Sequence, residues 1–134
     1  MIKLFEINED NFFDVRDLSV ADPQRGFLDS ALGIIARGYV YRSCRARVIG
    51  IEEDGVALGL ALVKDMDEEP ACYDLQQFMI DRRYQGRGIG TEALRMILSD
   101  LEKECRYDCV EVCVNKDDSA AISMYEKAGF VDTG

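Results

Sequence analysis

Hydrophobic positions recur with a period of two in some segments of the chain and with helical spacing in others, which predicts a mixture of strands and helices. The period of two predicts strands over residues 3–7, 47–53, 56–63, 73–80 and 109–115. Helical spacing predicts helices over residues 10–18, about 27–39, the segment after Gly90, and 118–129. The helix after Gly90 is the clearest, because it carries Leu94, Ile97, Leu98 and Leu101 on one face.

Turn signals separate these elements. Asp54-Gly55 lies between two predicted strands and suits the two-residue turn of a hairpin. Pro23 and Gly26 mark a loop between the first two helices, and residues 65–70 form an acidic loop. Gly129 is the residue type expected just beyond a helix C-terminus. The order of the elements predicts a mixed α/β fold in a single domain over residues 1–134.

Composition and charge restrict the classes of function. The chain has 26 acidic and 16 basic residues, a net charge of −10, which disfavours nucleic acid and anionic membranes as partners and allows a cationic substrate. No stretch approaches the roughly 18 apolar residues of a membrane span, and the N-terminus lacks the order of a secretory signal. The sequence therefore predicts a soluble, cytoplasmic protein.

The cysteines predict thiols rather than a disulfide framework or a metal site. They are Cys44, Cys72, Cys105, Cys109 and Cys113. Their number is odd and no secretory signal is present, which favours reduced side chains. The chain has no histidine and no Cys-x-x-Cys spacing, so no zinc site is expected. We expect these cysteines to be buried or half-buried structural residues.

The chemistry-bearing stretch is the turn between the strand at 73–80 and the following helix. Gly86, Gly88 and Gly90 allow backbone N–H groups to converge on an anion, and the helix N-terminus adds partial positive charge. A tight turn without a ligand is the plainer interpretation. Residues 88–93 also fit the G-x-G-x-x-A dinucleotide pattern, with Asp117 as a ribose-binding acid, but a doubly wound sheet cannot be completed from the remaining elements.

Two motifs resemble those of the GNAT acetyltransferases. Residues 85–90, Gln-Gly-Arg-Gly-Ile-Gly, are similar to the Q/R-x-x-G-x-G/A pyrophosphate loop of that superfamily. Residues 118–130 resemble its N-x-x-A-I-x-x-Y-x-x-x-G-F helix, with Asp118 in place of the usual asparagine. The resemblance covers residues 72–130 and rests upstream on the order of elements. It implies the GNAT fold, a mixed and mostly antiparallel sheet flanked by helices and splayed between its fourth and fifth strands.

The resemblance implies that acetyl-CoA is the acetyl donor and that it lies in the splayed cleft. The residues that would bind it are the main chain of Phe78, Met79 and Ile80, the loop Gln85, Gly86, Arg87, Gly88, Ile89, Gly90 and Thr91, and Asn115, Asp118, Ala121 and Tyr125. Aspartate at 118 can still cap the helix but cannot donate a hydrogen bond, and Asn115 could supply the missing amide.

Catalytic roles follow from the same resemblance. Tyr125 matches the tyrosine assigned as general acid at the departing sulfur, although an aromatic core residue is the alternative. Asp74, Gln76 and Phe78 share one face of a regular strand, and enzymes of the family carry a carboxylate at either of the first two positions. The resemblance therefore implies that Asp74 is the base, whereas Gln76 can only orient water or substrate. The alternative for Asp74 is a simply solvated aspartate.

The acceptor implied by the resemblance is a primary amine of a small cationic molecule. Residues 73–90 look most like the polyamine and diamine acetyltransferase branch, although Gln76 and Gln77 replace acidic residues of that branch. The acidic residues of the loop at 65–70 could attract a polycation. The alternative function is an acyl-CoA-binding sensor or interaction module without turnover.

The last residues bear on assembly. GNAT domains usually continue with further strands, and Phe130-Val131 is where the first of them should begin. The resemblance therefore implies that the chain is truncated or that a partner completes the sheet. We expect a homodimer.

Overall fold

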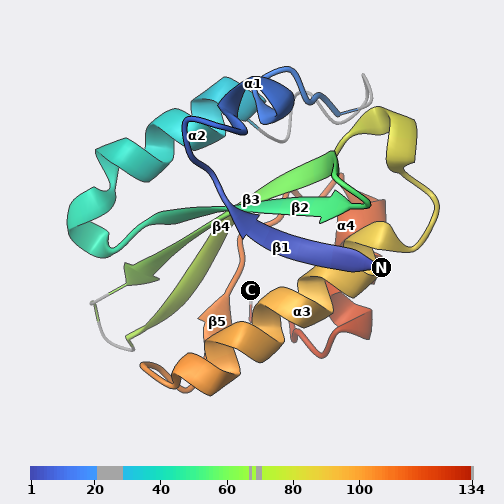
Figure 1. Cartoon of the computed structure of the whole chain (residues 1–134). Coiled ribbons are helices and arrows are strands. Elements are labelled where there is room, and N and C mark those ends of the chain that lie inside the picture. The colour runs from blue at the N-terminus through green and yellow to red at the C-terminus, as the bar shows by residue number, and fades with distance from the viewer. Residues whose placement is uncertain (21–28, 67, 69–70, 134) are drawn as a thin grey trace.

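A five-stranded sheet lies between two groups of helices (Figure 1). The computed structural model describes residues 1–20, 29–66, 68 and 71–133. The strands are β1 Ile2–Glu6, β2 Arg47–Glu53, β3 Val56–Met66, β4 Cys72–Ile80 and β5 Val110–Glu111, and they lie in that order. Pairs β1–β2, β2–β3 and β3–β4 are antiparallel, whereas β4–β5 is parallel. The mixed, mostly antiparallel sheet is thus confirmed.

Helices cover both faces of the sheet. They are α1 Phe12–Val15, α2 Ala31–Val40, α3 Ile89–Glu104 and α4 Ser119–Lys127, with short 3₁₀ turns at Arg42–Cys44 and Arg82–Tyr84. In Figure 1, α1 and α2 lie above the sheet and α3 below it, and Tyr125 of α4 belongs to the same hydrophobic core as α3. Leu60 and Leu62 of β3 join one hydrophobic core with α1 and α2, whereas Ala61 and Val63 join the other with α3. Strand β3 is therefore buried on both faces, as its nearly continuous apolar sequence requires.

The hairpin between β2 and β3 is confirmed, and its turn shows why the dipeptide is needed. Asp54 and Gly55 have φ values of +52° and +80°, so both central residues occupy the left-handed region. A two-residue turn of this kind matches the twist of the flanking strands. Glycine and aspartate are among the residues that adopt positive φ at low cost.

Two predicted helices are shorter than expected. Helix α1 has four residues rather than the range 10–18, because the side chains of Asn8 and Asn11 bond to nearby backbone groups and form turns before it. Helix α2 begins at Ala31, where the Ser30 hydroxyl accepts a hydrogen bond from the N–H of Gly33 at 3.0 Å. Pro23, Gly26 and Phe27 lie outside the described residues.

The strand predicted over 109–115 is paired only at Val110–Glu111. The alternation behind the prediction is real, because Val110, Val112 and Val114 are half-buried. Residues 112–115 nevertheless lie beyond the two positions at which β5 pairs with β4, and they form no strand. Among the described residues after α4, Phe130 and Val131 likewise form no strand.

The burial expected for the cysteines is wrong for three of the five. Cys72 is buried and Cys44 is half-buried, but Cys105, Cys109 and Cys113 are exposed. Cys105 caps the C-terminus of α3 in a left-handed conformation, and the other two lie in the segment around β5, where the sheet ends. All five are free thiols.

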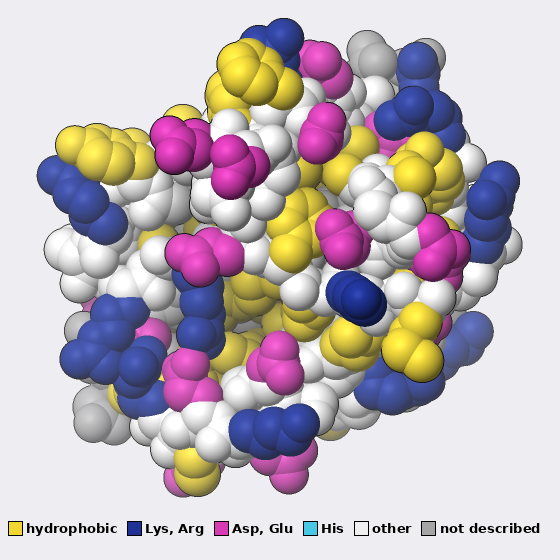
Figure 2. Space-filling view, viewed as in Figure 1, with side chains coloured by type: hydrophobic (Ala, Val, Ile, Leu, Met, Phe, Trp, Pro, Cys, Tyr) yellow, Lys and Arg dark blue, Asp and Glu magenta, His cyan; other side chains and the backbone are white. Residues whose placement is uncertain are grey.

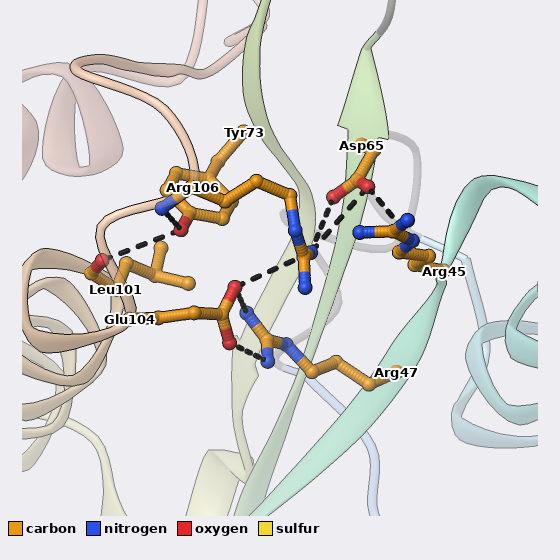
Figure 3. A network of polar contacts seen from close by, with 7 residues as sticks. All are labelled: Arg45, Arg47, Asp65, Tyr73, Leu101, Glu104 and Arg106. Carbon is orange, nitrogen blue, oxygen red and sulfur yellow. Dashed lines mark hydrogen bonds and ion pairs between the residues drawn. The ribbon is translucent and has the colours of Figure 1, made fainter.

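The acidic loop predicted at 65–70 begins later than expected, because β3 continues to Met66. Asp67, Glu69 and Pro70 lie outside the described residues. Asp65 is not solvated, since its side chain is 6% exposed. Its carboxylate accepts a hydrogen bond from Arg106 at 3.2 Å, and the Arg45 side chain lies 3.7 Å away (Figure 3). Asp65 looks like part of an acidic loop in the sequence because other acidic residues follow it, but it forms a structural ion pair with Arg106.

The Asp65 pair belongs to a polar network that joins the end of α3 to the sheet (Figure 3). Arg106 also contacts Glu104 at 3.3 Å, and Glu104 receives two hydrogen bonds from Arg47 of β2 at 2.6 and 3.2 Å. The Tyr73 hydroxyl accepts from the backbone N–H of Arg106 at 2.9 Å and donates to the carbonyl of Leu101 at 3.4 Å. This network holds the chain in place just before β5.

A groove lies between β1, β2 and α3, and Arg47, Leu101 and Glu104 of this network are among the residues that line it. Its volume is about 390 Å³, and Leu4 and Ile49 are among its apolar lining residues. Figure 2 shows hydrophobic side chains at the floor of a hollow on this face, with charged side chains around it.

Removing Arg106 should destabilise the fold. Arg106→Ala leaves the buried Asp65 carboxylate without its hydrogen-bonded cation, and we expect the free energy of unfolding in urea denaturation to fall clearly below that of the wild type. Arg16→Ala is the matched control, because Arg16 pairs with Asp17 at 3.7 Å with both side chains well exposed. That change should cost less than about 1 kcal/mol. Equal losses in the two variants would contradict a structural role for the network.

Candidate active site

The parting of β4 and β5 opens a cleft. The two strands pair only at Tyr73↔Val110 and Asp74↔Glu111, reinforced by a hydrogen bond from the Tyr73 N–H to the carbonyl of Cys109 at 3.0 Å. Beyond these positions the two segments separate around a cleft of about 330 Å³. Residues 75, 76 and 78–80 border the cleft on one side, and residues 112–115 border it on the other. The predicted splay between the fourth and fifth strands is confirmed.

A β-bulge in β4 sets the direction of its side chains. Leu62 of β3 pairs with Gln77 and Val63 pairs with Leu75, so Gln76 is the extra residue. The bulge breaks the alternation: Tyr73, Leu75, Phe78 and Ile80 join the core beneath α3, whereas Gln76 and Gln77 bond to residues of the α2 segment. The prediction that Phe78 shares a face with Asp74 and Gln76 is therefore wrong.

The glycine-rich turn closes one end of the cleft. Gly86 and Gly88 have φ values of +80° and +77°, a conformation that glycine adopts without strain. Glycine suits position 90 because of close packing rather than backbone conformation. A Cβ there would lie 3.3 Å from the Met124 sulfur of α4 and 3.5 Å from Ile80. The Gln85 amide donates to the carbonyl of Ile80 at 2.8 Å and fixes the turn to the end of β4.

The turn has the donors that an anion needs. Helix α3 begins with Gly88 as N-cap, and within the described residues no side chain makes a capping hydrogen bond there. The first N–H groups of the helix and the helix dipole are directed at the cleft end where Gly86, Gly88 and Thr91 line the wall. A Cβ built at Gly86 or Gly88 meets nothing within 4 Å, so the space above the turn is open. The arrangement fits a pyrophosphate group.

Arg87 does not line the cleft. Its guanidinium lies 5.9 Å from the ring centroid of Tyr84, and Arg83 lies 5.2 Å from the same ring. The backbone of the turn, rather than the Arg87 side chain, is thus what the cleft presents in this structure.

A buried aspartate that the sequence did not single out anchors the turn. Asp81 accepts hydrogen bonds from the backbone N–H of Ser19 at 3.0 Å and from the N–H and side chain of Arg83 at 3.0 and 2.8 Å. Burial raises the pKa of Asp81, but these hydrogen bonds outweigh it and hold the pKa below its usual value. Asp81 thereby brings Val20, which lines the cleft, to the end of β4.

Helix α4 forms the opposite wall. Asp118 caps it by accepting from the N–H of Ala121 at 3.2 Å, as predicted, and Asn115 accepts from the N–H of Asp117 at 2.9 Å. Asn115, Asp118, Ala121 and Tyr125 all line the cleft. Tyr125 is 8% exposed and packs edge-on against Phe130 with centroids 5.4 Å apart. Burial, with a smaller effect of Asp118, raises the pKa of Tyr125 far above 10, so its phenol keeps its proton.

Comparison with known proteins decides the family. The model of the acetyltransferase (GNAT) family matches residues 3–130. The chain belongs to this family. It is therefore an acetyl-CoA-dependent acyltransferase, and the glycine-rich turn at its cleft is consistent with a phosphate-bearing donor.

Curated relatives and solved structures agree with this assignment. A spermine/spermidine N(1)-acetyltransferase of Bacillus subtilis is 24% identical over 139 residues, covering 99% of this chain and 90% of that protein. The N-alpha-acetyltransferase RimI of Mycobacterium tuberculosis is 31% identical over 87 residues, covering 64% of this chain and 52% of that protein. The ribosomal-protein-S18-alanine N-acetyltransferase of Escherichia coli has the same fold, with a TM-score of 0.75 at 18% identity over 100% of this chain and 80% of that one.

The candidate base of this acetyltransferase lies beside the cleft rather than in its lining. Asp74 is 8% exposed, and the Lys64 ammonium lies 3.4 Å from its carboxylate. Burial raises the pKa of Asp74 above its usual value, although the charge of Lys64 pulls in the opposite direction. Asp74 is therefore not simply solvated, and by the alternation before the bulge it shares a face with Gln76.

Most of the predicted site residues come together. The cleft is lined by Gln76, Phe78, Met79, Ile80, Gln85, Gly86, Gly88, Ile89, Gly90, Thr91, Asn115, Asp118, Ala121 and Tyr125, and not by Asp74 or Arg87. Sequence reasoning missed Val20, Leu75, Tyr84, Val112, Cys113, Val114, Ala120 and Met124. Helical spacing from Ala121 could have found Met124, whereas no sequence signal marks Val20.

None of the helices in the described residues combines the length and hydropathy that crossing a membrane requires. No group of three or more acidic or cysteine side chains among them is placed to hold a metal ion.

The buried phenol can be counted by alkaline titration. The chain has six tyrosines, and absorbance near 295 nm reports their ionisation. Because Tyr125 resists ionisation, Tyr125→Phe should leave the amplitude of the native titration up to about pH 11 unchanged. In the denatured protein the same substitution should remove one tyrosine's share of the amplitude. A reduced native amplitude would show that Tyr125 ionises in the ordinary range.

Proposed function

We propose that this acetyltransferase moves an acetyl group from acetyl-CoA to a primary amine of a small cationic acceptor, by direct attack in a ternary complex. The observation that carries the proposal is one cleft that joins an anion-binding turn to a phenol that holds its proton. A polyamine or diamine is the favoured acceptor. The negative net charge of the chain and its similarity to the Bacillus subtilis enzyme named for spermine and spermidine support this choice.

The donor end follows from the backbone. The N–H groups from Gly86 to Thr91 would hold the pyrophosphate of acetyl-CoA at the N-terminus of α3. Main-chain groups of Phe78, Met79 and Ile80 border the cleft where β4 has no neighbouring strand, so they can bond to the pantetheine arm as a strand edge does. An N–H of this segment, near Phe78 or Met79, would also polarise the thioester carbonyl.

Tyr125 is the proposed acid. The phenol lines the cleft opposite β4, and burial raises its pKa, which keeps it protonated near neutral pH. It would donate a hydrogen bond to the departing sulfur and thereby stabilise the charge that develops there.

Asp74 is the proposed base, acting through water that Gln76 holds. Both side chains are on the α2 side of β4, but only Gln76 borders the cleft. A raised pKa makes the Asp74 carboxylate a better proton acceptor than an ordinary aspartate. The proton would leave the ammonium nitrogen for the water, and the water would give a proton to Asp74.

We further propose a cytoplasmic homodimer. Free thiols are typical of a reducing compartment. Within the described residues, β5 pairs with β4 alone and leaves an edge of the sheet open, which another chain could cover. Sedimentation or light scattering tests the oligomeric state.

The function is tested by thiol release from acetyl-CoA with a panel of amines: spermidine, spermine, diaminopropane, lysine, an aminoglycoside and an N-terminal peptide. Release that depends on the polyamines supports the favoured acceptor. Release with the peptide alone would replace it with a protein α-amine, in line with the RimI relative. Tight acetyl-CoA binding without release from any amine would support a sensor or interaction module instead.

Replacing the acid separates an enzyme from a binding module. Tyr125→Phe should lower kcat by about 100-fold or more, because the departing sulfur loses its hydrogen-bond donor. The Kd of acetyl-CoA by calorimetry should stay within about twofold, since the ring is kept and the substitution removes one hydroxyl. An unchanged kcat would remove Tyr125 from the mechanism.

The base predicts a shift in the pH profile. Lys64 lowers the pKa of Asp74, so Lys64→Met should raise that pKa and move the acidic limb of kcat/KM to higher pH. Below that limb Asp74 is protonated and cannot accept a proton. Lys3→Met, on the exposed face of β1, is the control and should leave the limb in place. A limb that does not move in Lys64→Met would show that Asp74 is not the titrating base.

A further inference from the structure

A glycine inside α2 makes room for a carboxylate. Gly33 is in the first turn of α2, where alanine would be more favourable by about 1 kcal/mol. A Cβ at this position would collide with the Asp29 side chain, which folds back over the turn. One Asp29 oxygen accepts from the N–H of Ser30 at 2.8 Å, which fixes the carboxylate there. The glycine thus permits one specific placement of Asp29.

The Asp29 carboxylate in turn directs an arginine to the bulge of β4. Its second oxygen accepts from Nε of Arg37 at 2.8 Å, and NH1 of Arg37 donates to Oε1 of Gln76 at 3.1 Å. The backbone N–H of Asp29 donates to Oε1 of Gln77 at 3.1 Å. Both glutamines at the bulge therefore accept hydrogen bonds from Asp29 and Arg37, which lie just before α2 and within it.

The contact with Arg37 determines which end of the Gln76 amide is available. A guanidinium has donors and no acceptor, so the amide oxygen of Gln76 must face Arg37. The amide nitrogen is then the part of Gln76 that a molecule in the cleft can contact. Gln76 lines that cleft, and Arg37 does not.

Stability does not explain the arrangement. The Asp29 and Arg37 side chains are 32% and 37% exposed, and ion pairs at such exposure contribute little to folding. A glycine in a helix lowers stability further. The arrangement is better explained by what it does to Gln76.

We propose that Asp29 and Arg37 are positioning residues that fix the Gln76 amide as a hydrogen-bond donor at the acceptor end of the cleft, and that Gly33 is required for their placement. The inference rests on the proposed amine acetylation. A water bound to the Gln76 amide nitrogen through one lone pair keeps the other lone pair for the proton of the ammonium group. Without Arg37 the amide can flip, and its oxygen then competes for that proton without passing it on.

The first test is Arg37→Ala, with kcat and KM for the amine measured at saturating acetyl-CoA. We expect kcat/KM for the amine to fall about tenfold or more, the equivalent of one hydrogen bond to a charged group. The Kd of acetyl-CoA and the Tm should be unchanged. Arg42→Ala is the matched control, because Arg42 is an arginine just after α2 that bonds to the carbonyl of Tyr39. Equal kinetics in the two variants would overturn the proposal.

Gly33→Ala is the sharper test, because it touches neither Arg37 nor Gln76. The added methyl displaces the Asp29 carboxylate, so we expect the same loss in kcat/KM for the amine with a Tm equal to or above that of the wild type. The double variant Gly33→Ala, Asp29→Ala should show no further loss. Wild-type kinetics in Gly33→Ala would contradict the requirement for glycine.

Coupling to Gln76 distinguishes positioning from a general effect on α2. In a Gln76→Ala background, Arg37→Ala should not lower kcat/KM for the amine any further. A double variant whose loss in kcat/KM is the product of the two single losses would overturn the proposal. The side-chain amide resonance of Gln76 can be assigned in nitrogen-15 spectra, because it is missing from the spectrum of Gln76→Ala. We expect its chemical shift in Arg37→Ala to differ from that in the wild type. If the wild type acetylates no amine, the proposed function fails and this inference with it. If the wild type is active and Arg37→Ala is equally active, the inference alone fails.

Discussion

The short pairing of β4 with β5 is the constraint on which the rest of the structure depends. Their two paired positions are fixed by contacts of Arg106, which precedes β5 in the chain. Its backbone N–H donates to the Tyr73 hydroxyl and its side chain donates to Asp65. Past the two paired positions β4 pairs with no strand on the β5 side among the described residues, and unpaired backbone groups require a partner. The cleft, the glycine-rich turn that follows β4 and the helix that follows β5 all take their positions from this divergence.

The bulge at Gln76 places apolar side chains of β4 on one side of the strand and polar side chains on the other. One inserted residue turns Phe78 and Ile80 to the core beneath α3, so the strand that borders the cleft is firmly packed. The same insertion turns Gln76 and Gln77 to the α2 segment, where polar side chains receive them. A regular strand could not present apolar residues on one side and two consecutive polar residues on the other.

Local signals made part of this structure predictable. The Asp54-Gly55 hairpin, the glycine-rich turn and the Asp118 cap each depend on a few neighbouring residues, and each is present. The bulge was not predictable, because no glycine or proline marks it and its register is set by β3. The length of β5 also depends on a distant strand, although its valines alternate as expected. Arg37 lies on a helix far from Gln76 in sequence, so only the fold could bring the two side chains into contact.

The raised pKa of Tyr125 bears on the role proposed for this residue in acetyl transfer. A thiol has a pKa of about 8.5, so moving a proton fully from a phenol of much higher pKa to a thiolate is unfavourable. In the proposed mechanism the phenol would therefore act mainly as a fixed hydrogen-bond donor to the departing sulfur. Such a donor lowers the barrier without having to be recharged between turnovers. The same burial that prevents Tyr125 from ionising thus makes it suited to stabilising a developing charge.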